Sequence, residues 1–502
     1  MIRSLLILQL LALTVLSTIT LAQVSPKRGM AYGYHTTADL NAVKPGISWW
    51  YNWTNTPDAA IASYYSSQGV EYVPMLWNDS YTVANAIAAI PAGTKYLLAY
   101  NEPNFNVEAN MTPAQAVAAW PKIEQVAAAL NLQIISAAPA YCGGSVCLSG
   151  YTDPVKWHDD FFAACPTCKV DYIAFHNYEP TVGALTFLTG NLKKYGRPIW
   201  VTEFAYWDPA ASGAAKIAYL QSAVAAFEND PDIYRYSWFA GRSAANPSVS
   251  ILGANGVLTS LGSAYIGAAY GPKNSIPGKI EVENLYRRKG TQLQATTDLG
   301  GGQNVGYTDP GTWNEYLVNI STSGSYTFKF RLASNATGGS FDIKLDDNLI
   351  KSNVIVANTG GWQTWVDYNV TGIALNAGEH LLKFEFKTTG TNMNYFTTIA
   401  ETTLPLEIHE ESFNNGSSIN FNDNYSLAPN PFSQSTNFKI SSTPHSKISI
   451  KVIDMKGSCV YSSNEYTTNE SIALGKELPN GVYTLMITML DSVKFVKIIK
   501  AE

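Results

Sequence analysis

The sequence predicts a multidomain chain, with a (β/α)8 TIM barrel followed by a jelly-roll β-sandwich and a small immunoglobulin-like β-sandwich. Short apolar runs recur through the first half, with helical stretches between several of them. After residue 278 the helical pattern stops and alternating strands follow. A polar stretch over residues 403–425 then precedes a last all-β segment. The length of 502 residues is consistent with about three domains.

An apolar N-terminal run predicts a signal peptide over residues 1–22. Arg3 gives the run a positive start, residues 5–16 are mostly apolar, and residues 20–22 suit cleavage before Gln23. The run is shorter than the roughly 20 residues of a membrane span, and no second run of this kind follows. We therefore expect an exported protein with no transmembrane anchor, and a membrane anchor is the alternative.

The composition argues against a nucleic-acid-binding protein. Charged residues make up 14% of the chain, the net charge is -6, and no basic stretch is present to neutralise phosphates. Aromatic residues make up 12%, and 30 of them are tyrosines. Few charges and many aromatic rings suit a protein that meets neutral, hydroxyl-rich ligands.

Eight apolar runs predict the strands of a barrel over residues 23–270, followed by a linker over residues 271–278. Eight strands over about 240 residues match a (β/α)8 barrel in number and size. A doubly wound open sheet is the alternative, but its first turn is usually rich in glycine, whereas residues 34–37 read Tyr-His-Thr-Thr. The expected strands are 29–34, 48–53, 72–77, 96–101, 133–138, 171–178, 198–204 and 234–240, and the clearest helices are 112–130 and 213–229.

Four of the five cysteines lie close together in this domain. An exported protein can keep disulfides, so we expect two bonds among Cys142, Cys147, Cys165 and Cys168, with the pairing left open. A zinc site is the alternative, although no histidine pair lies nearby at ligand spacing. Cys459 is left without a partner.

Two carboxylates lie at the ends of predicted strands. Glu102 follows the fourth strand and Glu203 closes the seventh. Catalytic groups of a barrel come from the C-terminal ends of strands, and two carboxylates over one groove are what cleavage of a glycosidic bond requires. The alternative is that each glutamate is a salt-bridged strand end.

Aromatic residues at other strand ends fit the same chemistry. Trp and Tyr rings pack against the flat C–H faces of sugars. We expect Trp77, Tyr178 and Trp238 to line the substrate cleft. His176 lies two residues before Tyr178, on the same face of the strand, where it would contact substrate or be a core histidine.

The barrel resembles glycoside hydrolase family 128, the β-1,3-glucanases of clan A. Residues 48–53, 74–77, 101–104 and 200–205 carry the resemblance. It implies Glu102 as general acid/base, Glu203 as nucleophile, net retention, and Asn101 bonded to a sugar hydroxyl, with no cofactor for catalysis. The partner would be a β-glucan polysaccharide. The alternatives are a hydrolase of another β-glycan, such as xylan, or a catalytically silent glycan-binding surface protein.

The predicted sandwich, residues 279–402, resembles carbohydrate-binding module family 6. The resemblance implies a sugar site at Tyr307, Trp362 and Asn394, with Gln294 where a carboxylate is often found. It also implies a structural calcium ion held by Glu281 and Glu283, whose alternative is a surface pair. The stretches that carry it are 280–284, 300–307, 309–313, 360–365 and 392–396.

The last segment, residues 426–502, resembles the C-terminal sorting domain of the type IX secretion system. Residues 427–432, 481–483 and 497–500 carry the resemblance. It implies type IX secretion machinery as a partner and a secreted or cell-surface location. A plain immunoglobulin-like spacer is the alternative. Tandem modules on linkers also suit a monomer.

Overall fold

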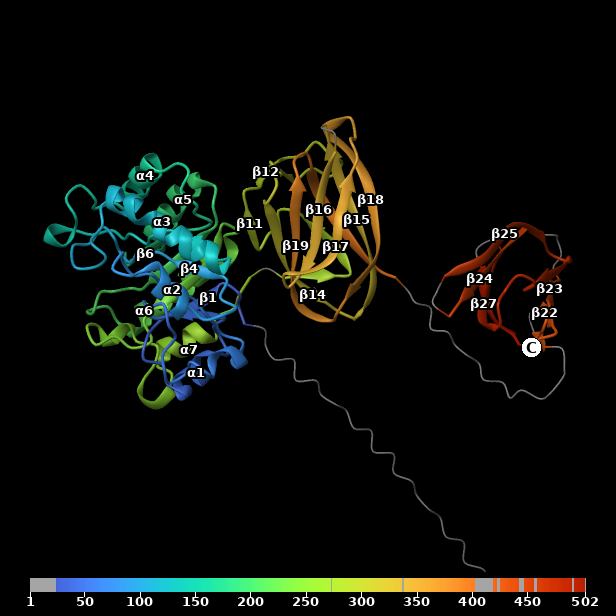
Figure 1. The fold of residues 1–502 in the computed structure, drawn as a ribbon, viewed down its shortest axis with the longest axis horizontal. Helices are drawn as coiled ribbons and strands as arrows, with labels where there is room; N and C mark the ends of the chain where they lie inside the picture. Colours follow the sequence, from blue (N-terminus) through green and yellow to red (C-terminus); the bar gives the residue numbers. More distant parts are fainter. Residues whose placement is uncertain are drawn as a thin grey trace, which may run out of the picture. The chain divides into compact units, whose positions relative to one another are not determined.

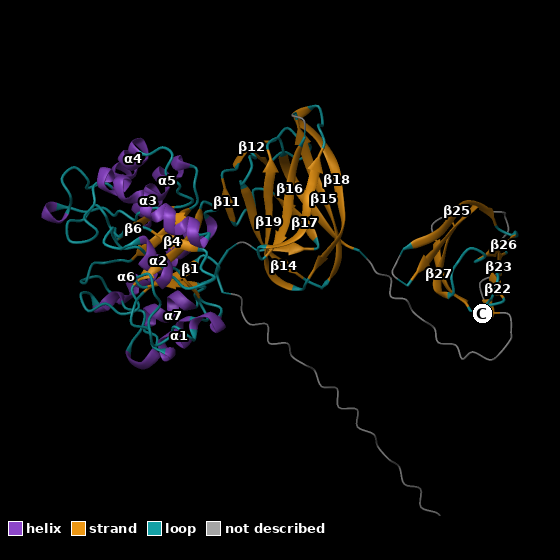
Figure 2. Cartoon of the chain, viewed as in Figure 1, coloured by secondary structure: helices purple, strands orange, loops and turns teal. Residues whose placement is uncertain are grey.

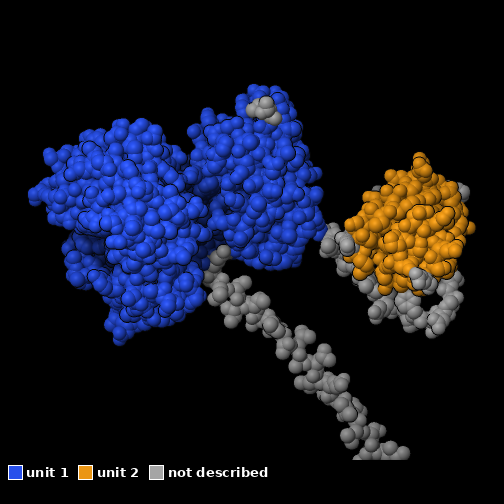
Figure 3. All heavy atoms as spheres, in the orientation of Figure 1, with its two compact units in different colours: residues 1–402 blue, residues 403–502 orange. Residues whose placement is uncertain are grey.

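The structure is a computed structural model that describes residues 24–271, 273–335, 338–401, 419–421, 425–441, 447–455, 458–489 and 492–501. The predicted signal peptide, residues 1–22, lies outside the described residues. The chain divides into two compact units, residues 1–402 and 403–502 (Figure 3). In the described part of the chain, no helix is both long and apolar enough to cross a membrane.

The first part of unit 1 is an α/β domain in which the strands pair in parallel (Figure 1). One sheet has the order β3-β2-β1-β8-β7-β6, and β4 pairs with β5. Single parallel bridges join Met75 to Leu98 and Ile135 to Tyr172, so the pairing runs from each strand to the next and back to the first. The strands are β1 Arg28–Ala31, β2 Trp49–Tyr51, β3 Glu71–Tyr72, β4 Tyr96–Leu98, β5 Gln133–Ile135, β6 Ile173–Asn177, β7 Ile199–Phe204 and β8 Ile233–Phe239.

Helices lie between these strands, and side-chain caps fix where several of them begin. Thr112 caps α3 through a capping box with Gln115, and Ser212 caps α6. Both helices coincide closely with those predicted. The helices are α1 Thr37–Val43, α2 Val83–Ala89, α3 Pro113–Leu130, α4 Pro154–Ala164, α5 Val182–Leu192, α6 Gly213–Asn229 and α7 Ser260–Ile266, with short 3-10 turns η1 Tyr65–Gln68, η2 Gly144–Val146, η3 Lys193–Tyr195, η4 Pro247–Val249 and η5 Ala254–Gly256.

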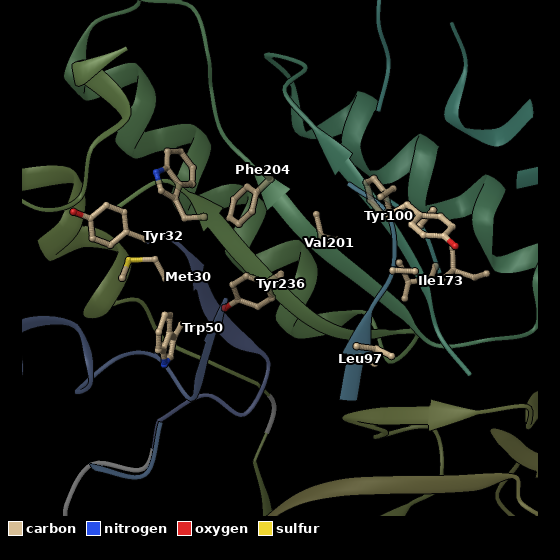
Figure 4. Close-up of a cluster of buried hydrophobic side chains, with 14 of the residues drawn as sticks. Met30, Tyr32, Trp50, Leu97, Tyr100, Ile173, Val201, Phe204 and Tyr236 are labelled. Atoms are coloured by element: carbon tan, nitrogen blue, oxygen red, sulfur yellow. The ribbon is translucent and has the colours of Figure 1, made fainter. Parts of the chain in front are cut away.

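Alternate residues of each strand supply two separate cores. Trp50 belongs to the large cluster between strands and helices, together with Val201 and Phe204 (Figure 4). Trp49 and Trp200 belong to a second cluster, which we call the interior cluster. The period of two along a strand sends neighbouring side chains to opposite faces, so one strand contributes to both cores.

The second part of unit 1 contains only strands and loops among its described residues (Figure 2). One sheet has the order β12-β13-β20-β15-β18, with β10 beside β20, and the other has β11-β14-β19-β16-β17, with β9 beside β14. Apolar side chains of both sheets form a separate core. The strands are β9 Asn274–Ile276, β10 Gly278–Glu281, β11 Arg287–Lys289, β12 Gln292–Ala295, β13 Gln303–Gly306, β14 Trp313–Ile320, β15 Gly324–Ser334, β16 Gly339–Leu345, β17 Asn348–Val356, β18 Gly361–Leu375, β19 Gly378–Thr388 and β20 Asn392–Ala400.

The linker predicted over residues 271–278 is wrong in its second half. Residues 274–276 form β9, which pairs in parallel with residues 318–320 of β14. The Gly, Pro and Asn residues of this stretch are typical of a linker. However, the stretch pairs with the edge of β14, and Ile276 is buried. The predicted linker over 403–425 also contains a strand, β21, and most of its other residues lie outside the described part.

Unit 2 is built from two antiparallel four-stranded sheets in the described residues. Their orders are β21-β22-β23-β26 and β25-β24-β27-β28, and one apolar cluster lies between them. The strands are β21 Ile419–Phe421, β22 Tyr425–Ala428, β23 Thr436–Ile440, β24 Lys447–Asp454, β25 Cys459–Thr467, β26 Ser471–Leu474, β27 Gly481–Met489 and β28 Ser492–Lys500.

The two disulfides predicted in the α/β domain are present. Cys142 is bonded to Cys147 and Cys165 to Cys168, while Cys459 is free and exposed. Each bond closes a short loop, one after β5 and one after α4. All four clustered cysteines are therefore used in disulfides, and the zinc alternative is wrong.

Candidate active site

Glu102 and Glu203 come together at the C-terminal ends of β4 and β7. One carboxylate oxygen of each lies within 4.8 Å of the other and of a ring nitrogen of His176. Both glutamates are buried, and Glu102 has a positive φ of 36° in the turn after β4. The predicted meeting of these two carboxylates at one place is confirmed by this geometry.

Glu203 is held by three hydrogen-bond donors. Its Oε1 accepts from the Tyr51 hydroxyl at 2.8 Å and from the Trp53 indole N–H at 2.7 Å. Its Oε2 accepts from the Tyr178 hydroxyl. Burial raises the pKa of Glu203, whereas the charge of His176 and the bonds from Tyr178 and Trp53 oppose that rise. These donors orient both oxygens and favour the ionised form.

His176 lies between the two carboxylates and has no exposed surface. Its Nδ1 is 2.8 Å from Oε1 of Glu102 and 3.5 Å from Oε2 of Glu203. Burial disfavours the imidazolium, but the negative charges of Glu203 and Glu102 outweigh it and raise the pKa of His176. His176 is therefore part of the site, although it touches the glutamates rather than lying open to a ligand.

The same three residues are also the group whose spacing could suit a metal ion. However, both oxygens of Glu203 already accept hydrogen bonds from neutral donors, and Nδ1 of His176 is bonded to Glu102. These contacts occupy both oxygens of Glu203 and one of the two ring nitrogens of His176. The donor set therefore fits a proton-transfer site better than a metal centre.

Asn101 lies beside Glu102 and is fixed by a third carboxylate. Its Nδ2 donates to Oε2 of Glu108 at 3.1 Å, while its Oδ1 is buried without a hydrogen-bond partner among the described residues. Burial, followed by the charge of Glu102, raises the pKa of Glu108. Glu108 thus holds the Asn101 amide in the orientation that leaves Oδ1 free to accept a hydrogen bond.

Half-buried aromatic rings surround Glu203. Tyr178 packs edge-on against Trp207 and Phe239, with ring centroids 5.7 and 5.8 Å apart, and Phe239 also contacts Trp53. Trp77 lies with Trp53 and Phe239 at the margin of the interior cluster. Of the predicted cleft aromatics, Tyr178 thus contacts Glu203 and Trp77 lies near the site.

The prediction that Trp238 lines the cleft is wrong. Its side chain is fully buried between sheet and helices, where it packs against Phe204 and Tyr265, and its indole N–H donates to the Val249 carbonyl at 2.8 Å. Neighbouring residues of β8 face opposite sides, so Phe239 instead reaches the site.

Sequence reasoning did not identify Tyr51, Glu108 and Phe239 as residues of the site, and it noted Trp53 only as an aromatic residue at a strand end. Tyr51 and Trp53 lie two residues apart in the predicted strand 48–53. This spacing could have indicated that they share one face of the strand. Glu108 lies in a loop and gives no such signal.

In the sandwich, Tyr307 and Trp362 are 59% and 45% exposed, so both rings are accessible to a ligand. The side-chain N–H of Asn392 donates to the Trp362 carbonyl at 2.8 Å. A Cβ built on Gly306, next to Tyr307, would lie 3.0 Å from Oδ1 of Asn392 and 3.0 Å from Nε2 of Gln294. Polar amides therefore lie beside two exposed rings.

The predicted sugar-binding role of Asn394 stays a prediction, because the structure shows this residue bonded within the protein. Asn394 is 2% exposed, and its Nδ2 donates to Oδ2 of Asp298 at 2.8 Å. Asp298 also forms a two-bond ion pair with Arg331. Asn394 thus supports a buried polar network, whereas Asn392, which is 4% exposed, bonds to the Trp362 backbone.

The two predicted calcium ligands differ in their surroundings. Oε1 of Glu281 lies 2.6 Å from Nζ of Lys279, and the Glu281 side chain is 41% exposed. Oε2 of Glu283 is buried and has no hydrogen-bond partner among the described residues. A buried carboxylate oxygen is costly without a partner, so the surroundings of Glu283 fit a cation, whereas Glu281 is engaged by a lysine.

Three family models match consecutive parts of the chain. A glycosyl hydrolase catalytic core matches residues 29–265, a carbohydrate binding module of family 6 matches residues 281–400, and a secretion system C-terminal sorting domain matches residues 426–501. The sorting domain indicates export by type IX secretion, as predicted.

Individual relatives agree with these models. The chain is 41% identical to the GH128 (subgroup II) endo-β-1,3-glucanase of Sorangium cellulosum, covering 49% of this chain and 99% of that one, with a TM-score of 0.46. It is 37% identical to the module CBM6cm-2 of Cellvibrio mixtus lichenase 5A, covering 25% of this chain and 98% of that one, with a TM-score of 0.24.

Among curated proteins, alkali-sensitive linkage protein 1 of Schizosaccharomyces pombe is 29% identical over 262 residues, which are 49% of this chain and 45% of that protein. The chain spans less than half the length of the curated relatives it matches. The identity to the S. cellulosum protein, by contrast, extends over nearly all of its length. The chain therefore belongs to glycoside hydrolase family 128, and it carries a family 6 carbohydrate-binding module and a secretion sorting domain.

Proposed function

We propose that the protein is a secreted, retaining β-1,3-glucan hydrolase. The observation that carries this proposal is the convergence of the Glu102 and Glu203 carboxylate oxygens within 4.8 Å. Retaining glycosidases hold their two carboxyl groups about 5–5.5 Å apart, whereas inverting enzymes leave roughly 6.5–9.5 Å for a water molecule. The choice of β-1,3-glucan rests on family membership and on the relatives named as endo-β-1,3-glucanases.

Glu203 is the proposed nucleophile and Glu102 the proposed acid/base. The donors Tyr51, Trp53 and Tyr178 point at both oxygens of Glu203, which favours a carboxylate ready to attack. In the first step Glu203 bonds to the anomeric carbon while Glu102 protonates the departing oxygen. In the second, water attacks the anomeric carbon as Glu102 accepts its proton, and the bond between that carbon and Glu203 breaks.

The remaining site residues would bind the sugar. Oδ1 of Asn101 is free to accept a bond from a hydroxyl next to the reacting carbon. The rings of Trp53, Trp77, Tyr178 and Phe239 would pack against sugar faces. His176 would act on the two glutamates rather than on the substrate.

We also infer the finer architecture. The ring of parallel pairs supports a closed (β/α)8 barrel over residues 23–270, and the paired sheets of unit 2 support an immunoglobulin-like tail over 426–502. The module would span 274–402, bind glucan at Tyr307, Trp362 and Asn392, and hold a structural calcium ion at Glu283. The protein would act as a monomer on its polymer.

The experiment is a comparison of polysaccharides with the mature chain. Laminarin, curdlan, xylan, agarose and mixed-linkage glucan are each incubated with the wild type, and the anomer formed first is followed by NMR. We expect release of β-anomeric products from laminarin and curdlan. Glu203→Gln should abolish turnover, and Glu102→Gln should reduce it by roughly 10²–10⁴-fold.

The outcomes separate the alternatives. Turnover of xylan rather than laminarin would show that xylan is the substrate, while the proposed hydrolysis by Glu102 and Glu203 would stand. A first-formed α-anomer would contradict retention. Equal rates for the wild type and Glu203→Gln would favour a glycan-binding protein without catalysis. Added azide should rescue Glu203→Gly as an α-glycosyl azide and Glu102→Gly as a β-glycosyl azide, which tests the two roles separately.

A further inference from the structure

Trp313 belongs to the module by sequence but to the barrel by packing. It begins β14 of the sandwich, yet it is part of the interior cluster, whose other buried members all come from the α/β domain, on its strands or beside them. Its ring lies 6.0 Å from that of Tyr234 on β8, and only 8% of the residue is exposed. It is absent from the module's own core among the described residues. The module therefore contributes a side chain to the core of another domain.

Charged side chains of the module lie around Trp313 and also face the barrel. The Arg287 guanidinium lies 4.3 Å from the centre of the Tyr234 ring. Glu315 bonds to Arg287 at 2.5 Å and pairs with Lys383 at 3.1 Å, and all three residues are buried. Burying this many charges is costly unless they are paired and packed. The face of the module that carries these charges therefore suits a position packed against another domain.

Further contacts form a ring around this centre. Arg288 forms a two-bond ion pair with Asp232, at 2.7 and 3.0 Å, and its backbone N–H donates to the Pro231 carbonyl. The Tyr286 hydroxyl donates to Oε2 of Glu228 at 2.8 Å in a buried position. Weaker pairs join Lys289 to Asp171 at 3.8 Å and Asp347 to Lys95 at 3.9 Å.

The barrel partners of this ring share one location. Lys95, Asp171 and Asp232 each lie just before a strand, namely β4, β6 and β8, and Glu228 lies at the end of α6. These are the N-terminal ends of the parallel strands. Glu102 and Glu203 lie at the opposite, C-terminal ends. The module thus contacts the floor of the barrel and leaves the catalytic end uncovered.

We propose that the carbohydrate-binding module has a second function as the structural floor of the catalytic barrel, with Trp313 closing its interior core. The module is then a rigid part of the catalytic unit rather than a tethered targeting domain. The sequence pattern of a linker predicts the tethered arrangement, in which each domain completes its own core and the facing surfaces are polar. This inference does not depend on which glycan the enzyme cleaves.

The test is hydrogen exchange with peptide resolution on the full mature chain, comparing the wild type with Trp313→Ala. If Trp313 closes the barrel, amides of β4, β6 and β8 should exchange about tenfold faster or more in the variant, because a cavity opens in their core. Peptides of β15 and β18, on the far sheet of the module, should keep their protection. Tyr368→Ala, which removes a half-exposed ring from β18, is the matched control and should leave the barrel strands unchanged. Trp313→Phe should restore most of the protection.

Two results would overturn the proposal. One is that Trp313→Ala accelerates exchange only in module peptides and leaves β4, β6 and β8 at wild-type rates. The other is additivity of the milder substitutions Arg288→Gln and Asp232→Asn, which test the interface if Trp313→Ala fails to fold. A real contact predicts that the double variant loses less protection at β8 than the sum of the single variants, whereas additive effects would show that the contact is absent in solution.

Discussion

Nδ1 of His176 lies 2.8 Å from Oε1 of Glu102, so a fully buried imidazole from β6 touches the carboxylate that follows β4. The same nitrogen is 3.5 Å from Glu203. The two carboxylates raise the pKa of His176, and the charge of His176 in turn opposes the rise in the pKa of Glu203 that burial causes. The ionisation of Glu203 therefore depends on a residue that a sugar would not need to touch.

His176→Asn should move the acidic limb of the pH profile to higher pH. Without the imidazolium, the pKa of Glu203 rises, so a higher pH is needed to ionise the proposed nucleophile. The measurement is kcat/KM for laminarin against pH in the wild type and the variant. An acidic limb at the same pH in both proteins would show that His176 does not act on Glu203.

Tyr178→Phe should lower kcat/KM by about 10–100-fold, the value of roughly 1.5–3 kcal/mol for a hydrogen bond to a charged group. The hydroxyl donates to Oε2 of Glu203, and burial and the charge of Glu203 raise the pKa of Tyr178, so it remains a donor at all working pH values. Tyr96→Phe, which removes a buried hydroxyl bonded to Tyr234 at the opposite, N-terminal end of the strands, is the control. Equal losses in both variants would point to packing instead.

Glu108→Ala should lower kcat by about tenfold with a smaller change in KM, because the Asn101 amide loses the acceptor that orients it. Glu108→Gln keeps an acceptor oxygen of the same reach and should retain most of the activity. Steady-state kinetics of both variants separate the hydrogen bond from the charge. If the alanine variant were fully active, Asn101 would be held by other contacts.

Trp238→Ala should destabilise the α/β domain by about 3–5 kcal/mol, as expected for the loss of a large buried ring. Below its unfolding temperature, the variant should keep the wild-type KM for short oligosaccharides, since the ring faces the helices. Denaturant unfolding and kinetics at low temperature measure the two effects. A selective rise in KM at unchanged stability would restore Trp238 to the substrate site.

Asn392→Ala should weaken binding of the chain to insoluble glucan, whereas Asn394→Ala should mainly lower the stability of the module. Asn392 lies beside Trp362, and Asn394 is committed to Asp298. Pull-down with curdlan, using the Glu203→Gln background to prevent digestion, gives the affinity, and thermal unfolding gives the stability. The reverse pattern would contradict the assignment.

The sequence by itself determined the order of domains, the strands that carry Glu102 and Glu203, and the sorting tail. These features depend on local patterns, namely apolar runs with a period of two or near four, and residue types at strand ends. In a parallel sheet the C-terminal ends of strands meet on one side, so the two glutamates could be expected together before any coordinates were known.

Tertiary structure alone decided which side of β8 the Trp238 ring lies on, the burial of Asn394, and the domain core in which Trp313 packs. The strands of a barrel are apolar on both faces, so the sequence does not reveal which alternate residues point inward, and register shifts along β7 and β8 change that alternation. The bond from Asn394 to Asp298 joins residues that are distant in sequence. Trp313 joined the barrel because two domains share a core, and contacts of this kind leave no local pattern in either domain.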